Sequence, residues 1–130
     1  MIVLDASAVV ELVVEPKTAT HALRDRLRSD PDAKSPHLVD AEVANALRRK
    51  LLAGELDLGR AHRAVRRLQV MHLVRWPQTT LLDRALALRD QLTAYDATYV
   101  ALAEGLGANL LTRDRRLAGT AGHRARVELV

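Results

Sequence analysis

Two aspartates, Asp5 and Asp114, each stand at or just beyond the end of a short apolar segment, residues 1–4 and residues 108–112. Such segments are typical of buried parallel strands, and open α/β sheets bind ligands beyond the carboxyl ends of these strands. If the two strands are neighbours in the sheet, both carboxylates face one crevice. Each aspartate could instead only cap the helix that follows it, which is a common role for this residue. We favour a shared functional site over two independent helix caps.

A third candidate carboxylate, Asp96, lies at the start of a helix predicted for residues 95–105. There it either interacts favourably with the helix N-terminus or faces the same crevice. A fourth candidate is Glu42, in a helix predicted for residues 37–53. Helical periodicity does not distinguish Glu42 from its neighbour Asp40, so the pattern leaves both residues open.

Carboxylates gathered at one crevice need a cation beside them. Two carboxylates about 5 Å apart repel each other by roughly 3 kcal/mol at an effective dielectric constant near 20, and they raise each other's pKa unless a cation offsets the charge. The sequence has no cysteine, and its five histidines are dispersed. Ligands that are all oxygen favour Mg²⁺ or Mn²⁺ over zinc, and such ions support phosphodiester hydrolysis by activating water and stabilising the leaving oxygen.

The amino-acid composition excludes several classes of protein and favours others. The 130 residues are enough for one domain, and 48% of them are apolar, which is enough for a core without disulfides. The lack of cysteine excludes a thiol nucleophile. The net charge of +4, carried mainly by 17 arginines, suits a polyanionic partner, whereas three aromatic residues are too few to form a surface that stacks single-stranded bases. No signal peptide or membrane-spanning segment is recognisable, so we expect a soluble, cytoplasmic protein.

Short apolar strands alternate with amphipathic helices, which predicts an α/β fold with a mostly parallel sheet. No repeat or linker divides residues 1–130, so we expect a single domain. The predicted strands are residues 1–4, 32–35, 72–76, 108–112 and 126–130. The predicted helices are residues 7–14, 18–29, 37–53, 58–69, 80–92 and 95–105, with one short helical turn after residue 114.

Four segments of the sequence resemble the four acidic motifs of PIN domains, in particular those of the VapC toxins of bacterial toxin–antitoxin systems. The segments are Val3–Val10, Glu42–Arg49, Tyr95–Glu104 and Leu110–Asp114. Each motif alone is unspecific, but together they occur in the expected order, with compatible spacing, and span nearly the whole chain.

The resemblance implies one acidic site built from Asp5, Glu42, Asp96 and Asp114, and it thereby selects Glu42 over Asp40. It implies that the three aspartates hold the principal metal ion, Mg²⁺ or Mn²⁺. Glu42 would bind a second ion or position the attacking water.

Further residues are expected to support this site. The resemblance implies that Ser7 and Thr112 contribute hydroxyl contacts and that Asn45 orients Glu42. Three arginines flank Asp114 and are candidates to hold RNA phosphates near the metal or to contact an acidic segment of an antitoxin. They are Arg113, Arg115 and Arg116.

The resemblance also implies a fold and a function. The expected fold is a PIN-like three-layer α/β/α sandwich. The expected protein is a metal-dependent endoribonuclease, the toxin of a type II toxin–antitoxin pair that inhibits translation. It would form a homodimer and be neutralised by a VapB-type antitoxin.

Other classes of protein fit the sequence less well. A haloacid-dehalogenase-like phosphatase also ends its first strand in aspartate, but it needs a second aspartate two positions later, where this chain has Ser7. A receiver domain needs adjacent acidic residues at that strand end, and Asp5 stands alone. A non-catalytic RNA- or protein-binding module with the PIN fold is the remaining alternative. Its expected signature is the loss of an acidic residue, and none of the four is missing.

Overall fold

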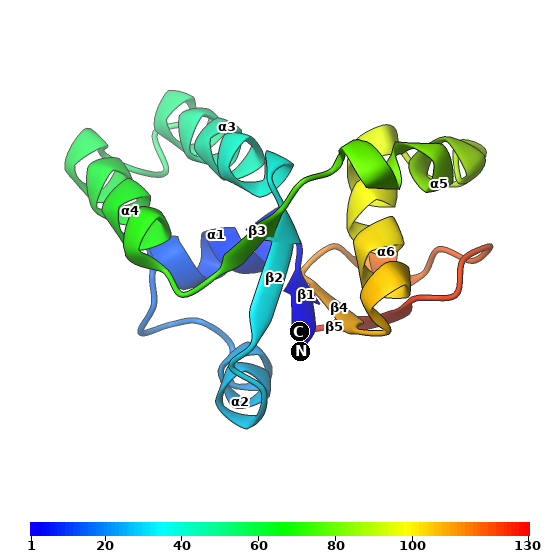
Figure 1. Ribbon diagram of the computed structural model, residues 1–130. Coiled ribbons are helices and arrows are strands. Elements are labelled where there is room, and N and C mark those ends of the chain that lie inside the picture. Colours follow the sequence, from blue (N-terminus) through cyan, green and yellow to red (C-terminus); the bar gives the residue numbers. More distant parts are fainter.

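Five short parallel strands form the centre of the computed structural model, which describes residues 1–130 (Figure 1). The strands are β1 (Ile2–Leu4), β2 (Ala33–Pro36), β3 (Val74–Trp76), β4 (Asn109–Thr112) and β5 (Arg126–Leu129). They lie in the order β3-β2-β1-β4-β5, and every neighbouring pair is parallel. The predicted α/β fold with a parallel sheet is therefore confirmed.

Helices lie on both sides of the sheet and complete a three-layer α/β/α sandwich (Figure 1). One layer holds α1 (Ala6–Val14), α3 (Leu38–Leu52) and α4 (Leu58–Val70). The other holds α5 (Leu82–Ala87) and α6 (Ala94–Leu106). The remaining helical segments are α2 (His21–Ser29), the 3-10 turn η1 (Thr79–Leu81) and α7 (Arg115–Ala118). None of these helices combines the length and the apolar character needed to cross a bilayer.

The centre of the sheet is buried because helices cover both of its faces. Ile2, Val3 and Leu4 of β1 are at most 1% exposed, as expected for a strand in the middle of a parallel sheet. On α6, all residues of the segment 97–103 are buried, since this helix packs against β1, β2 and β4 and also against α5. The small apolar residues of that segment allow the helix to lie close to the sheet.

The strand order reverses between β1 and β4. From β1 the sheet continues through β2 to β3, and the chain then crosses back to β4 and β5 on the other side. Leu4 at the end of β1 pairs with Leu111 of β4, so both strands end at the same edge of the sheet. The expected neighbourhood of the two strands is confirmed. Ligand crevices of open α/β sheets form at this kind of reversal.

Side-chain caps fix where several helices begin. Asp5, Asp57 and Asp114 precede α1, α4 and α7, and each carboxylate accepts hydrogen bonds from backbone amides of the first turn. A cap of this kind stabilises a helix by about 1 kcal/mol. The capping role considered for Asp5 and Asp114 is thus real, and the cavity described below shows that it does not exclude a second role.

The helix predicted for residues 80–92 is wrong in its second half. The helix ends at Ala87, and the chain continues as consecutive turns. The amide of Gln91, for example, donates to the carbonyl of Leu88 three residues back, which is a tighter connection than an α-helix makes. These turns place both Leu88 and Leu92 in the core. Burial of the two side chains stabilises this conformation more than a continued helix would.

Candidate active site

A cavity of about 1120 Å³ opens where β1 and β4 end. Its walls come from α1, α3, the start of α6 and the segment after β4. All four candidate carboxylates line it: Asp5, Glu42, Asp96 and Asp114. Four segments that are far apart in the sequence therefore each contribute one of the candidate carboxylates to a single cavity, which Glu11 and Glu15 also line.

Asp5 is the most buried of the four carboxylates, with 5% of the residue exposed. Its Oδ1 accepts hydrogen bonds from the Ser7 hydroxyl at 2.6 Å and the Ala8 amide at 2.9 Å, and its Oδ2 accepts one from the Thr112 hydroxyl. Burial raises the pKa of Asp5; the hydrogen bonds oppose this shift, and the charge of Asp96 adds to it. Three donors thus fix the Asp5 side chain at the floor of the cavity.

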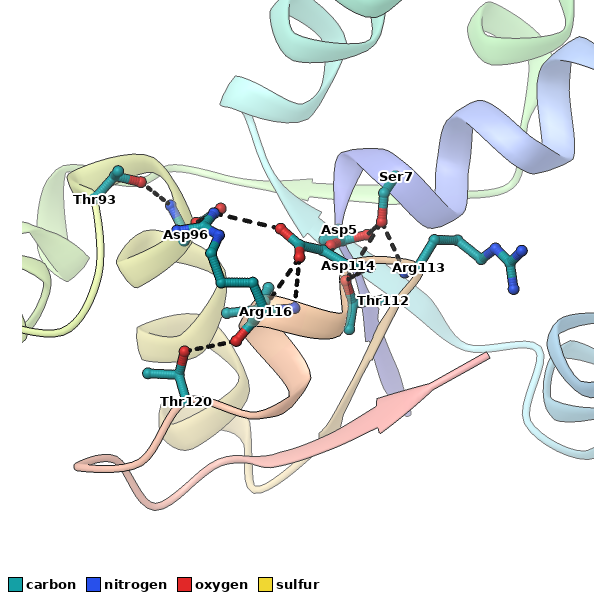
Figure 2. Close-up of polar contacts among 10 residues, drawn as sticks. Asp5, Ser7, Thr93, Asp96, Thr112, Arg113, Asp114, Arg116 and Thr120 are labelled. Carbon is teal, nitrogen blue, oxygen red and sulfur yellow. Dashed lines mark hydrogen bonds and ion pairs between the residues drawn. The ribbon is translucent and has the colours of Figure 1, made fainter.

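The two hydroxyls that hold Asp5 also join the ends of β1 and β4. The amide of Arg113 donates to the Ser7 hydroxyl at 2.8 Å, and the amide of Asp114 donates to the Thr112 hydroxyl at 2.9 Å (Figure 2). Each hydroxyl therefore gives its own proton to Asp5 and accepts one from the backbone. This network fixes the chain at Asp114 relative to Asp5.

Asp96 and Asp114 share a cation from the chain itself. The Arg116 Nη2 lies 3.0 Å from Asp96 Oδ2 and 3.4 Å from Asp114 Oδ2. Figure 2 shows the Arg116 side chain reaching from α7 towards these two carboxylates. Asp96 itself stands in the first turn of α6, which Thr93 caps through a hydrogen bond from the Asp96 amide.

Glu42 faces the cavity from α3 with one oxygen unpaired. Its Oε1 is buried and has no hydrogen-bond partner. The pKa of Glu42 is raised to about 7, mainly because burial disfavours the charged carboxylate; the neighbouring Tyr99 hydroxyl opposes this shift, and the charges of Asp96 and Asp5 add to it. The positive charge of Arg49, which also lines the cavity, offsets this shift only in part.

The structure separates Glu42 from Asp40, which the sequence pattern could not do. Asp40 forms an ion pair with Arg75 of β3, with Nη2 to Oδ1 at 2.9 Å, and it does not line the cavity. Asp40 therefore joins α3 to the edge of the sheet, and Glu42 is the acidic residue of α3 at the cavity.

The other candidates have different surroundings. Asn45 lines the cavity, but the buried Oε1 of Glu42 accepts no hydrogen bond from it. The Arg113 side chain points away from the candidate carboxylates (Figure 2). It forms an ion pair with Glu11 at 2.5 Å. Arg115 is exposed and does not line the cavity. Only Arg116, of the three flanking arginines, contacts the candidate carboxylates.

Tyr99 belongs to the candidate site, although it is not among the candidates drawn from the sequence. It lines the cavity, is 1% exposed, and its hydroxyl has no hydrogen-bond partner. Burial and, after it, the nearby charge of Glu42 raise the pKa of Tyr99. The signal that could have revealed it is its position three residues after Asp96, on the same face of the helix.

The donor set fits a hard divalent cation. No three acidic or histidine side chains are arranged to hold one ion as they stand. The cavity nevertheless brings the four candidate carboxylates together, burial and, after it, the charge of neighbouring carboxylates raise the pKa of Asp5 and Glu42, and a buried oxygen of Glu42 has no well-formed hydrogen bond. An ion that takes oxygen ligands would relieve each of these features. The three aspartates and Glu42 are the residues that would hold it.

Comparison with known sequences gives consistent matches over the whole chain. The sequence matches the PIN domain over residues 2–123. It is 41% identical over 130 residues to "Ribonuclease VapC12" of Mycobacterium tuberculosis, covering 100% of this chain and 99% of that protein. It is 39% identical over 129 residues to "Ribonuclease VapC1" of the same organism, covering 98% and 96% of the two chains.

Solved structures share the fold. PAE2754 from Pyrobaculum aerophilum superposes with a TM-score of 0.67 at 28% identity, covering 96% of this chain and 81% of that one. Mycobacterium tuberculosis VapC20, described as a sarcin-ricin loop cleaving toxin, has a TM-score of 0.65 at 21% identity, covering 95% and 99%. A toxin–antitoxin complex from Klebsiella pneumoniae has a TM-score of 0.62 at 18% identity, covering 92% of each chain.

Proposed function

The chain belongs to the PIN-domain family, as a member of the VapC type, and from this we propose that it is an endoribonuclease that depends on a divalent metal ion. Relatives at 41% and 39% identity over nearly the full length are ribonucleases by name. The observation that carries the proposal is the cavity at the strand reversal, where four separate segments each contribute one of the candidate carboxylates. A net charge of +4 suits a polyanionic substrate.

Each part of the site has a proposed role. Asp5, Asp96 and Asp114 would hold Mg²⁺ or Mn²⁺, and Glu42 would hold a second ion or position the attacking water. A bound divalent ion would supply positive charge at the scissile phosphate and a water of lowered pKa. The hydroxyls of Ser7 and Thr112 keep Asp5 in place through the hydrogen bonds described above.

The polar and basic residues around the carboxylates would orient Glu42 and bind other parts of the RNA or the antitoxin. Asn45 lies in the wall of the cavity, where it could orient Glu42 once the site is loaded. Arg115 is exposed and makes no ion pair, so it is free to contact an RNA phosphate. Arg113 and Arg116 line the cavity and would contact either RNA or an acidic antitoxin segment.

RNA cleavage tests this proposal directly. The purified, antitoxin-free protein is incubated with total bacterial RNA and Mg²⁺ or Mn²⁺, and the cut ends are mapped by sequencing. The variants are Asp96→Asn and, as a matched control, Asp90→Asn, an exposed aspartate outside the cavity. We expect discrete cuts that disappear with EDTA and in Asp96→Asn but persist in Asp90→Asn. Cuts that survive in Asp96→Asn, or folded protein that cuts nothing, would contradict the proposal.

We further propose that the chain is the toxin of a type II toxin–antitoxin pair and inhibits translation in the cytoplasm. Support comes from the VapC relatives and from the fold shared with the Klebsiella toxin–antitoxin complex. The expected partner is a VapB-type antitoxin. Induction of the chain alone should arrest protein synthesis, measured by labelled amino-acid incorporation, and co-expression of the antitoxin from the neighbouring gene should restore it. Unchanged incorporation with active ribonuclease present would contradict the toxin role.

A further inference from the structure

Arg116 stands where a metal ion would be expected. Its Nη2 lies within 3.4 Å of carboxylate oxygens from both Asp96 and Asp114, two of the proposed ligands (Figure 2). A guanidinium carries a single permanent charge and donates hydrogen bonds to carboxylates, so it satisfies the same two groups that a divalent ion would need. The arrangement also accounts for the lack of three converging ligands, because two of the carboxylates are turned towards the arginine.

The backbone at Arg116 is anchored, while its side chain is free to move. The Arg116 amide donates to Asp114 Oδ1 at 2.8 Å, and the Arg116 carbonyl accepts from the Thr120 hydroxyl at 2.8 Å. The side chain is 65% exposed, and the two carboxylates are its only hydrogen-bond and ion-pair partners. Rotation of the side chain into solvent therefore breaks two ion pairs and disturbs nothing in the core. Ion pairs this exposed are weak enough to be exchanged readily.

We propose that Arg116 is an internal counter-ion that occupies the cation position between Asp96 and Asp114 in the metal-free protein and competes with the divalent ion for these two carboxylates. This inference rests on the proposed metal site. Its consequence is that the metal binds less tightly than the carboxylates alone would bind it. In return, the metal-free protein avoids repulsion between Asp96 and its acidic neighbours.

The alternative is that Arg116 prepares the site, by holding Asp96 and Asp114 in the positions that the metal requires. The two roles predict opposite effects of removing the guanidinium. If Arg116 competes, its removal strengthens metal binding. If Arg116 prepares the ligands, its removal weakens metal binding. The direction of the change therefore decides between them.

Isothermal titration of EDTA-stripped protein with Mn²⁺ measures this direction without any cleavage assay. The test variant is Arg116→Gln. The control is Arg115→Gln, which removes the same charge one residue earlier from a side chain that touches neither carboxylate. We expect Arg116→Gln to bind Mn²⁺ about three- to tenfold more tightly than wild type, the range expected for loss of an exposed ion pair. Arg115→Gln should stay within about twofold of wild type, since distant exposed charges are screened.

Thermal denaturation of the same proteins supplies a second readout. Without metal, Arg116→Gln should melt below Arg115→Gln, because Asp96 and Asp114 then lack their cation. With saturating Mn²⁺, the gain in melting temperature should be larger for Arg116→Gln than for wild type. The melting curve also shows that each variant is folded.

The outcomes separate this inference from the proposed function. If wild type binds Mn²⁺ and Arg116→Gln binds it equally or less tightly, the counter-ion role of Arg116 is wrong, while the proposed metal site is still supported. An equal gain in Arg115→Gln would overturn it too, since net charge alone would then explain the result. Absence of Mn²⁺ binding in both wild type and Arg116→Gln would overturn the metal dependence together with the counter-ion.

Discussion

At the scale of single residues, Asp5 and Asp114 serve the fold and the cavity with the same side chain. Each carboxylate accepts hydrogen bonds from the first turn of a helix while it also lines the cavity. Asparagine caps helices about as well as aspartate, whereas alanine does not. Substitution by asparagine therefore removes the charge and keeps the cap. Substitution by alanine would remove both the charge and the cap, so a loss of activity could then result from lower stability.

The buried hydroxyl of Tyr99 yields a prediction about stability. This hydroxyl makes no well-formed hydrogen bond but lies beside the Glu42 carboxylate, so Tyr99→Phe removes a poorly satisfied polar group and a weak contact with Glu42. We expect the free energy of unfolding, measured by urea denaturation, to stay the same or to rise by up to about 1 kcal/mol. A fall of 1 kcal/mol or more would show that the hydroxyl is paired, with Glu42 as the nearest acceptor, and would contradict the account of this group.

The sequence indicated some site residues better than others. Asp5 and Asp114 were predictable because strand ends converge at a strand reversal in parallel sheets. Helical spacing alone could not choose between Glu42 and Asp40, because the partner of Asp40 is Arg75, 35 positions away; the resemblance to the PIN motifs made that choice. Likewise, three flanking arginines look equivalent in the sequence, and only the turn into α7 brings Arg116 onto two carboxylates.

At the scale of elements, an ion pair joins the two helices that cover one face of the sheet. Glu104 of α6 accepts two hydrogen bonds from Arg84 of α5, at 2.8 and 3.0 Å, and one from the Arg124 amide at 2.8 Å. The Arg84 guanidinium, more than any other group, lowers the pKa of Glu104 to about 2. Glu104 thereby holds α5, which is short, against α6, which borders the cavity.

This ion pair predicts how stability depends on pH. The pKa of Glu104 in the folded protein lies below its ordinary value of 4.5, so the stabilisation is complete above about pH 4.5 and is lost as the pH falls towards 2. Between pH 5 and pH 3, wild type should lose about 1–2 kcal/mol more of its unfolding free energy than Glu104→Gln, after allowance for solvent screening. Urea denaturation at both pH values measures the difference. Equal losses in the two proteins would contradict the role given to the pair.

Element types were more predictable than element ends. The five strands and the helices around them follow from apolar runs, caps and breaks that act locally. The helix at residues 80–92 was predicted too long because nothing local marks its end at Ala87. What ends it is the burial of Leu88 and Leu92 against the rest of the core, which depends on tertiary contacts.

At the scale of the whole molecule, one exposed apolar surface suits the expected homodimer. Leu82 and Leu86 stand one turn apart on α5 and are 51% and 66% exposed. Such neighbouring side chains are candidates for a contact between two copies of the chain. Leu58 of α4, 62% exposed on the opposite layer, provides a matched control.

The homodimer is tested by mass in solution. Wild type should elute with light-scattering mass near twice the 14.4 kDa of one chain. Leu86→Glu should shift it towards the mass of one chain, because a buried, unpaired charge opposes association, whereas Leu58→Glu should remain dimeric. A wild-type monomer would contradict the homodimer. If Leu86→Glu remains a dimer, the contact between the two copies does not involve α5.

The proposed divalent-metal site at the strand reversal can be tested by anomalous diffraction from crystals soaked in Mn²⁺. We expect an anomalous peak within ligand distance of the carboxylates of Asp5, Asp96 and Asp114, and no such peak in Asp96→Asn crystals prepared alongside. Clear density for all three aspartates with no manganese among them at millimolar Mn²⁺, or manganese bound only elsewhere, would contradict it.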